Sequence, residues 1–213
     1  MTPFLLVLSA PSGGGKTTIA KKLLQGRGDL GYSVSATTRA VRPGELNGRD
    51  YHFLTRPEFE RRQKQGEFLE SATYAGELYG TLKSEISRIF AEGRHAVLDV
   101  EIEGARQIRQ ALPNALLVFV LPPSAEELVH RLAGRNTEDP EVIRRRVARA
   151  AEELAAVREY DYVVVNEDLT DAVSQVASIL EAESHRVARQ TELSAFVEEL
   201  RRDVLKAAKK IEK

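Results

Sequence analysis

The chain has 213 residues, of which 42% are hydrophobic and 30% charged, as is ordinary for a soluble globular protein, and its formal net charge is −1. This near balance of charge argues against nucleic acid as the main partner. The lack of cysteine excludes disulfides, thiolate zinc sites and cysteine nucleophiles. No apolar stretch approaches the roughly 20 residues that cross a bilayer, and residues 4–8 are too short for the core of a signal peptide. We therefore expect a cytoplasmic protein without a membrane partner.

The strongest motif lies near the amino terminus, between the apolar run 4–8 and a helical pattern that starts near Lys16. It reads Ala10-Pro11-Ser12-Gly13-Gly14-Gly15-Lys16-Thr17. The order strand, glycine-rich loop, helix matches the phosphate-binding loop except at Ala10, where the pattern has its first glycine. The glycines let backbone N–H groups turn toward a phosphate, and the helix presents its positive end to the same anion. In this pattern Lys16 reaches the β- and γ-phosphates, and the Thr17 hydroxyl ligates Mg²⁺.

Short apolar runs along the rest of the chain predict the core strands. They lack alternation, as expected of parallel strands that are covered on both faces. Helical patterns lie between or after them, so the sequence predicts an α/β fold with a five-stranded parallel sheet. The expected strands are residues 4–8, 33–36, 95–100, 115–121 and 162–165.

The helical patterns have recognisable start signals. Ser124 begins a helix with a capping box to Glu127, and Pro140 suits the first position of a helix behind Asp139 as N-cap. We expect this last helix to run to about residue 159. The remaining expected helices are residues 82–91, 102–112 and 170–182.

Two segments interrupt the alternation of strand and helix. Residues 37–81 combine a polar loop, a short strand at 51–54, a short helix after Pro57 and a strand at 67–74, which predicts a small antiparallel insertion. Residues 131–149 are dense in arginine and flank a turn at 134–139 that we expect to be mobile.

The last segment, 190–213, has a helical pattern with an apolar stripe. The stripe consists of Leu193, Phe196, Val197, Leu200, Val204, Leu205 and Ile211. The first expectation is a helix packed on its own domain. The alternatives are a helix paired with another subunit, which would make a homo-oligomer, and a frayed tail.

The insertion opens with a candidate for a second phosphate site. Arg39 and Arg42 are three residues apart in a loop with little to pack against, and the planar guanidinium suits bidentate phosphate binding. Tyr51 and Tyr79 offer hydroxyl donors nearby in the sequence. An alternative interpretation, a solvated charged loop, would apply to an isolated pair of arginines.

This run, Ser35-x-x-Thr38-Arg39-x-x-Arg42-x-Gly44-Glu45-x-x-Gly48-x-Asp50-Tyr51, closely resembles guanylate kinases. The resemblance covers about residues 1–185, and the form of the phosphate loop with Ala10 is similar to bacterial members. The further matching motifs are Gly66-Glu67-Phe68-Leu69-Glu70, Tyr79-Gly80-Thr81, Leu98-Asp99-Val100-Glu101 followed by Gly104, Arg131-Leu132-x-x-Arg135-x-Thr137-Glu138, Ile143-x-x-Arg146 and residues 163–168.

The resemblance implies a P-loop NTPase fold and transfer of the ATP γ-phosphoryl group to GMP, giving ADP and GDP, with Mg²⁺ as cofactor. It also implies three parts: a core, a small α+β insertion that binds GMP, and a helical lid. The expected division is core 1–36, 82–130 and 158–189, insertion 37–81, lid 131–157 and a C-terminal helical extension 190–213.

The resemblance also assigns residues to each substrate. The expected ATP site consists of Ala10, Pro11, Ser12, Gly13, Gly14, Gly15, Lys16, Thr17, Thr18 and Asn166. The expected GMP site consists of Ser35, Arg39, Arg42, Glu45, Tyr51, Glu70, Tyr79, Thr81, Asp99 and Glu101. The residues expected to act on the transferring phosphoryl group are Lys16, Arg39, Asp99, Arg135 and Arg146, and the expected metal ligand is Thr17.

Chemistry supports the role of Glu70 in base selection. Guanine offers two adjacent donors, N1–H and the 2-amino group, and one carboxylate accepts both, whereas adenine has an acceptor at N1. Asp99 ends a core strand, where it would order Mg²⁺-bound water or contact the acceptor nucleotide, and Glu101 stands where the family often has Asp. Arg149 is expected to be solvated or paired with Glu152 or Glu153.

Three other functions fit parts of the sequence. One is a different nucleotide or sugar-phosphate kinase, which the presence of Ser35, Glu70 and Thr81 disfavours. Another is a non-catalytic guanylate-kinase-like binding module, for which a damaged phosphate loop would be expected, whereas Lys16 and Thr17 are present. The last is a P-loop protein that binds nucleic acid, which the charge balance disfavours.

Overall fold

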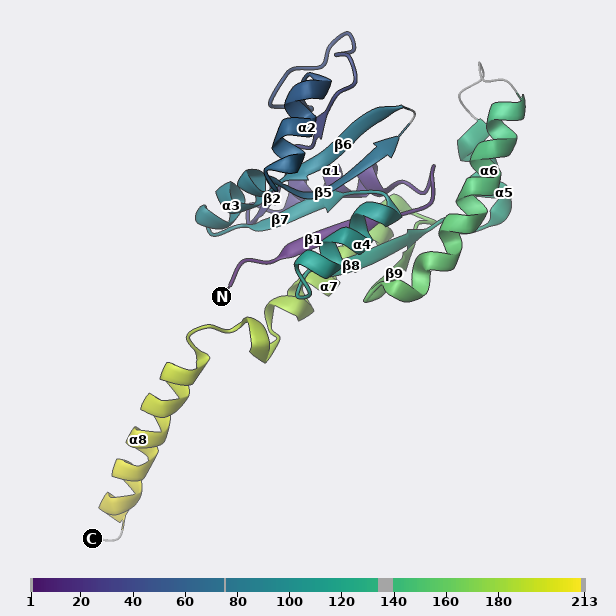
Figure 1. Cartoon of the computed structure of the whole chain (residues 1–213). Coiled ribbons are helices and arrows are strands. Elements are labelled where there is room, and N and C mark those ends of the chain that lie inside the picture. The colour runs from purple at the N-terminus through teal and green to yellow at the C-terminus, as the bar shows by residue number, and fades with distance from the viewer. Residues whose placement is uncertain (1, 75, 134–139, 212–213) are drawn as a thin grey trace.

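Figure 1 presents a computed structural model of the chain, which describes residues 2–74, 76–133 and 140–211. The core is the expected five-stranded sheet, with all neighbouring strands parallel and the order β2-β7-β1-β8-β9. The strands are β1 (Leu5–Ser9), β2 (Leu30–Tyr32), β7 (His95–Asp99), β8 (Leu116–Leu121) and β9 (Tyr162–Val165). The expected α/β fold class is therefore confirmed.

Helices cover both faces at the centre of this sheet, which explains why β8 is apolar throughout and β1 is apolar up to Ser9. Alternate side chains of β1 enter two different buried clusters, Leu6 and Leu8 on one face and Leu5 and Val7 on the other. The first cluster is closed by α1 (Lys16–Gly26) and α7 (Leu169–Ser184). The second is closed by α3 (Lys83–Ala91) and α4 (Ile102–Ala111).

The insertion forms a second, smaller sheet of four strands in the order β4-β3-β6-β5. Its pairs are antiparallel except β3 with β4, which is parallel, so the sheet is mixed rather than purely antiparallel as expected. The helix of the insertion, residues 56–64, packs on this sheet because the Phe59 ring stacks on the Phe68 ring, with ring centroids 4.3 Å apart. The elements are β3 (Ala36–Thr37), β4 (His52–Phe53), α2 (Arg56–Lys64), β5 (Phe68–Tyr74) and β6 (Glu77–Leu82).

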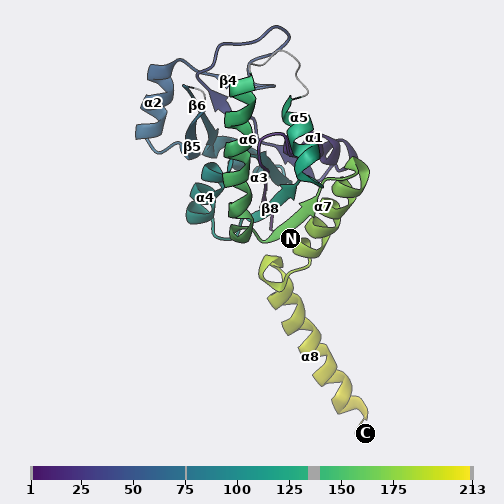
Figure 2. The same ribbon diagram turned by 90° about the vertical axis from the view of Figure 1, so that its right-hand side faces the viewer.

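The segment expected to be a lid is helical. Helix α5 (Ala125–Ala133) starts with the predicted cap, because the Ser124 hydroxyl accepts the N–H of Glu127 at 3.1 Å. Helix α6 (Pro140–Leu154) runs down the middle of the face that Figure 2 shows and continues as the 3₁₀ turn η1 (Ala155–Glu159). The predicted N-cap Asp139 and the expected mobile turn 134–139 lie outside the described residues.

The strand expected at 33–36 was misplaced. The core strand β2 is Leu30–Tyr32, and residues 33–35 carry the chain from the first sheet to the second, where β3 begins at Ala36. The reason is Gly31, which lowers the apparent strand propensity but is required by packing. A Cβ atom there would lie 2.6 Å from Ile89 of α3.

Helix α8 (Leu193–Ile211) follows the short turn η2 (Val187–Arg189) and extends away from the rest of the molecule (Figures 1 and 2). The expectation that it packs on its own domain is wrong, because its apolar stripe is exposed. The exposed members are Phe196, Val197, Leu200, Val204 and Leu205. Among the described residues, no helix has the length and hydropathy needed to cross a membrane.

Candidate functional site

The glycine-rich segment forms a tight loop between β1 and α1. Gly14 N–H donates to the Pro11 carbonyl at 2.8 Å, and Gly13 and Gly15 have φ values of 82° and 94°, which side chains rarely adopt. Helix α1 begins at Lys16 behind Gly15, and within the described chain no side chain caps it. The N–H groups of its first turn are therefore left for an anion.

Side chains from two distant segments hold this loop in place. The Asn166 amide, 6% exposed and just after β9, donates to the Gly14 carbonyl at 3.0 Å. The same nitrogen lies 2.3 Å from where a Cβ of Gly15 would be, so that position must be glycine. From helix α6, Glu153 Oε2 accepts the N–H of Ser12 at 3.0 Å. The loop is thus fixed between β9 and α6.

The reactive side chains of the loop meet two acidic residues at the carboxyl end of β7. The Lys16 ammonium contacts Glu101 Oε1 at 2.7 Å, and the Thr17 hydroxyl donates to Asp99. The other Asp99 oxygen accepts the Tyr32 hydroxyl at 2.6 Å. Burial, and then the neighbouring Asp99 charge, raise the pKa of Tyr32, so this phenol remains a donor. Four expected side chains and the adjoining Tyr32 therefore converge here.

The second sheet gathers a cationic and aromatic cluster. Arg39 places its guanidinium as a fork on Glu45, with contacts of 2.8 and 3.0 Å, and lies 5.2 Å from the ring centroid of Tyr51. Tyr79 lies edge-on to Tyr51 with centroids 6.1 Å apart. The hydrogen bond to Glu45 raises the pKa of Arg39, and the same bond lowers the pKa of Glu45. Arg42 donates its backbone N–H to Glu45 and exposes its side chain.

Glu70 is the buried carboxylate of this sheet. It is 7% exposed, and its Oε1 accepts the hydroxyl of Thr81, its register partner on β6, at 2.8 Å. Burial raises its pKa, and the Thr81 hydroxyl opposes this only in part. A carboxylate buried with so little compensation suits a ligand that brings its own N–H donors.

Helix α6, in the segment expected to be a lid, contributes arginines with defined contacts. Arg146 approaches the Leu132 carbonyl at 3.5 Å. Arg149 pairs with Glu153 at 2.8 Å, as expected, and its guanidinium lies 5.2 Å from the ring centroid of Tyr74 on β5. Helix α6 therefore touches both the phosphate loop and the insertion. Arg135 lies outside the described residues.

Comparison with known proteins decides the family. The family model of guanylate kinase matches residues 3–183. This chain belongs to the guanylate kinase family. Among its relatives, a guanylate kinase of Trichormus variabilis is 49% identical over 172 residues, 81% of this chain and 86% of that protein. One of Paramagnetospirillum magneticum is 46% identical over 198 residues, 92% of each chain. The crystal structure of guanylate kinase from Anaplasma phagocytophilum is 34% identical, with a TM-score of 0.76 over 93% of this chain and 95% of that one.

Some contacts in this guanylate kinase fold were not foreseen from the sequence. Tyr32 was missed because the strand that carries it was expected three residues later; with β2 placed correctly, its pairing with β7 brings it within two residues of Asp99. Glu153 was expected only as a partner for Arg149, and its contact with Ser12 has no signal in the sequence. Ser35 lies between the two sheets, where its carbonyl accepts the N–H of His52.

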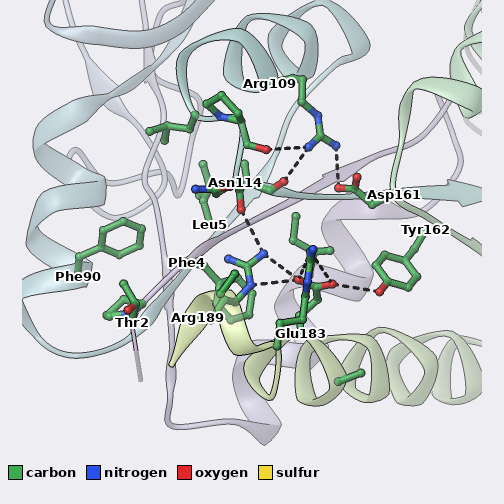
Figure 3. Close-up of a pocket in the computed structure, with 18 residues that line it drawn as sticks. Thr2, Phe4, Leu5, Phe90, Arg109, Asn114, Asp161, Tyr162, Glu183 and Arg189 are labelled. Carbon is green, nitrogen blue, oxygen red and sulfur yellow. Dashed lines mark hydrogen bonds and ion pairs between the residues drawn. The ribbon is translucent and has the colours of Figure 1, made fainter. Parts of the chain in front are cut away.

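A groove of about 900 Å³ lies at the amino ends of β1, β8 and β9, whereas the phosphate loop follows the carboxyl end of β1 (Figure 3). Its centre is Glu183, 3% exposed, which accepts hydrogen bonds from Arg189 at 2.8 Å and Tyr162 at 3.1 Å. Beside it Arg109 pairs with Asp161 at 2.7 Å. Arg186 also contacts Glu183, at 3.3 Å, so each charged side chain that lines the groove has a partner within it. The groove lies away from the phosphate loop of this guanylate kinase.

Proposed function

We propose that this chain transfers the γ-phosphoryl group of ATP to GMP, giving ADP and GDP in purine nucleotide metabolism, as its membership of the guanylate kinase family implies. The observation that carries the proposal is the combination of an intact phosphate loop ending in Lys16 and Thr17 with the buried, underpaired carboxylate of Glu70. Phosphoryl transfer requires that two phosphates are held in line, that their charge is neutralised and that water is excluded.

The donor half of the site is assigned to the phosphate loop and its neighbours. The loop amides of residues 10–15, with the first turn of α1 to Thr18, bind the ATP phosphates, and Lys16 exchanges Glu101 for a phosphate oxygen. Asn166 acts indirectly: its amide fixes the phosphate loop through the Gly14 carbonyl, and a contact with the adenine base is not needed for this role.

The hydroxyl of Thr17 and the carboxylate of Asp99 together fit Mg²⁺, which prefers oxygen ligands and takes only one or two from protein when phosphates supply others. When bound, Mg²⁺ neutralises charge on the β- and γ-phosphates. Within the described residues no cluster of three or more acidic or histidine side chains forms a metal site. A metal that arrives with ATP accords with this sparse set of ligands.

The acceptor phosphate is assigned to the cluster around Arg39. Glu45 holds the Arg39 guanidinium in one orientation, and Tyr51 and Tyr79 place hydroxyl donors in the same cluster, with Arg42 exposed at its rim. A guanidinium already fixed by a carboxylate loses less conformational entropy when it binds phosphate. Each such charge-assisted bond contributes about 1.5–3 kcal/mol.

The base is assigned to Glu70, supported by Thr81 and Ser35. Thr81 occupies one carboxylate oxygen, so the carboxylate is oriented before the base arrives. Guanine N1–H and its 2-amino group donate to this carboxylate, whereas adenine would place a lone pair against a buried negative charge. A site of this kind rejects the wrong base by about 10⁴-fold or more.

The lid is assigned to close over the transferring phosphoryl group with Arg146 and Arg135. Phosphoryl transfer in an open site would also reach water, so closure protects ATP. The contacts of Glu153 with Ser12 and of Arg149 with Tyr74 give α6 a fixed base from which such a movement starts. Small-angle scattering with GMP and a non-hydrolysable ATP analogue should show compaction.

The proposed reaction is tested by a coupled assay of ADP release with ATP and Mg²⁺. GMP, AMP, CMP and UMP are offered in parallel, and turnover is expected with GMP alone. Turnover with AMP but not GMP would contradict the assignment of Glu70. Absence of turnover with all four nucleotides, while ATP still binds, would place the chain among the non-catalytic modules of this fold.

Helix α8 supports a homo-oligomer. Leu193, Val197, Leu200 and Val204 are spaced by four, three and four residues, the spacing of a two-helix seam, and an isolated helix of this length is marginal in water. Sedimentation of Leu200→Glu should show a lower mass than the parent chain. Ala195→Glu, on the opposite face, is the matched control; equal masses for all three proteins would exclude pairing through this stripe.

The chemistry of both substrates supports a cytoplasmic enzyme, where ATP and GMP are available. The formal net charge of −1 provides no electrostatic basis for a nucleic-acid partner. Binding of labelled duplex or single-stranded nucleic acid at physiological salt would contradict this assignment.

A further inference from the structure

Helix α4 lies against the carboxylate of Glu70. A Cβ atom on Gly104 would be 2.8 Å from Glu70 Oε2, closer than real Cβ atoms approach, and 3.2 Å from its Cδ, a tight contact. The φ angle of Gly104 is outside the left-handed region, so its backbone accepts any residue. Glycine inside a helix is less stable than alanine because it loses more backbone conformational entropy. Space for Glu70 is therefore what glycine provides at this position.

One turn further along α4, Gln107 holds the strand that carries Glu70. Its Oε1 accepts the N–H of Ser71 and its Nε2 donates to the Ser71 carbonyl, both at 3.0 Å. Strand β5 is at the edge of its sheet, so these two backbone groups would otherwise have no strand to pair with. The side chain of Gln107 thus acts as a local strand partner next to Glu70.

Helix α4 also begins at the donor side of the site. Its N-cap is Glu101, which contacts Lys16, and the residue two positions earlier is Asp99, which contacts Thr17. The same short segment of chain that touches the phosphate loop therefore continues into the helix that contacts Glu70. A shift of α4 would move the donor contacts and the base-reading carboxylate together.

We propose that Gly104 and Gln107 are positioning residues for guanine selection. Gly104 leaves the space in which the Glu70 carboxylate faces the base, and Gln107 fixes the backbone of the strand that carries it. This inference rests on the proposed function, because it concerns how that same carboxylate is held.

Gly104→Ala tests the first part. The added methyl group meets the end of a flexible side chain, so the fold persists and Glu70 moves. The readout is the ratio of kcat/KM for GMP to that for IMP, which lacks the 2-amino group and loses one of the two donors. We expect this ratio to fall about tenfold, the effect of weakening one charged hydrogen bond. KM for GMP should rise while KM for ATP is unchanged.

Gly26→Ala is the matched control, because nothing lies within 4 Å of the added methyl group at the end of α1. A second control is the same Gly104→Ala change in the Glu70→Gln background, where the ratio should not change further. A folded Gly104→Ala protein with the parental ratio would overturn the role of Gly104. If the parent chain does not phosphorylate GMP, the proposed function fails before this inference is reached.

Gln107→Met tests the second part and does not depend on the first. Methionine keeps the length of the side chain and removes both hydrogen bonds to Ser71. We expect about a threefold fall in the GMP to IMP ratio, since a neutral hydrogen bond contributes less to such a difference than a charged one. An unchanged ratio, with calorimetry showing unchanged GMP affinity, would overturn it. If Gly104→Ala does not fold, this variant alone decides the proposal.

Discussion

Glu70 and Glu183 are buried to nearly the same extent, 7% and 3% exposed, but their surroundings differ. Glu70 accepts a hydrogen bond from the Thr81 hydroxyl, and burial holds its pKa above the ordinary value. Burial also acts on Glu183, but hydrogen bonds from Arg189, Tyr162 and Arg186 outweigh it and hold its pKa below the ordinary value. Glu70 lies on β5 of the smaller sheet, and Glu183 lies in the groove at the amino ends of the core strands.

The difference separates a carboxylate that stabilises the fold, Glu183, from one that we propose is prepared for a ligand, Glu70. At Glu183 the protein supplies the compensating charge, so the ionised form is the stable one (Figure 3). At Glu70 the protein supplies little, so the empty site is less stable than it would be without the charge. Burial alone does not distinguish these cases, whereas the number and charge of the partners do.

The largest expected effect is on activity. Glu70→Gln keeps an acceptor for Thr81 but replaces a charged acceptor of the guanine donors with an amide. We expect kcat/KM for GMP to fall about 10³-fold, since hydrogen bonds to charged groups contribute about 1.5–3 kcal/mol each. The coupled assay measures it. Glu67→Gln, three residues earlier and half exposed, should remain within about twofold of the parent.

The next largest expected effect is on the free energy of unfolding, from a change in the groove that contains Glu183. Glu183→Gln leaves Arg189 without its buried counter-charge, which should reduce the free energy of unfolding by about 3 kcal/mol. Denaturant titration measures it. KM for GMP should be unchanged in the folded protein. A raised KM would mean that the Glu183 groove and the proposed GMP site are coupled. Glu181→Gln, exposed on the same helix, is the control.

The two carboxylates should respond to acid in opposite directions. The pKa of Glu183 is lowered in the folded state, so its contribution is complete above the ordinary value of 4.5 and is lost as pH falls through the lower folded value. The difference in the free energy of unfolding between the parent and Glu183→Gln should therefore narrow as pH falls below 4.5. Denaturant titrations from pH 7 to 3 measure this, and a gap that widens would contradict the pairing.

The smallest expected effect is an increase in the stability of the ligand-free chain. The raised pKa of Glu70 means that its ionised form reduces stability at neutral pH, and that this cost disappears as pH falls from the raised folded value to 4.5. Glu70→Gln should therefore stabilise the ligand-free chain at pH 7 by about 1 kcal/mol, the usual size of such trade-offs with function. Differential scanning calorimetry measures it. A lower Tm would show that the buried amide is worse paired than the carboxylate.

The sequence predicts the core well because buried parallel strands leave continuous apolar runs. It predicts β7, β8 and β9 to within one residue at each end. It misses β6 and misplaces β2, and both strands contain a glycine at a close approach. Gly80 of β6 lies against the Phe68 ring, where a Cβ would be 2.8 Å away, and Gly31 lies against Ile89. Glycine weakens a strand pattern at the positions where packing requires it.

For the site, the sequence supplies residue types and the fold supplies their partners. Lys16 and Thr17 can be assigned from a local motif, but their contacts with Glu101 and Asp99 span more than 80 positions of the chain. Glu70 resembles an ordinary exposed glutamate until the insertion folds and buries it. The sequence periodicity of α8 does not predict the direction in which the helix extends, because an apolar stripe does not identify what covers it.

The contact between Lys16 and Glu101 bears on how the enzyme releases what it binds. In the proposed ATP site, the covalently attached Glu101 carboxylate competes with the nucleotide for the same ammonium group, at a local concentration that dilution cannot change. Binding therefore exchanges one ion pair for another instead of creating a new one. The affinity for nucleotide should consequently be moderate and depend weakly on ionic strength, so that a product is displaced without the loop ever holding an isolated charge.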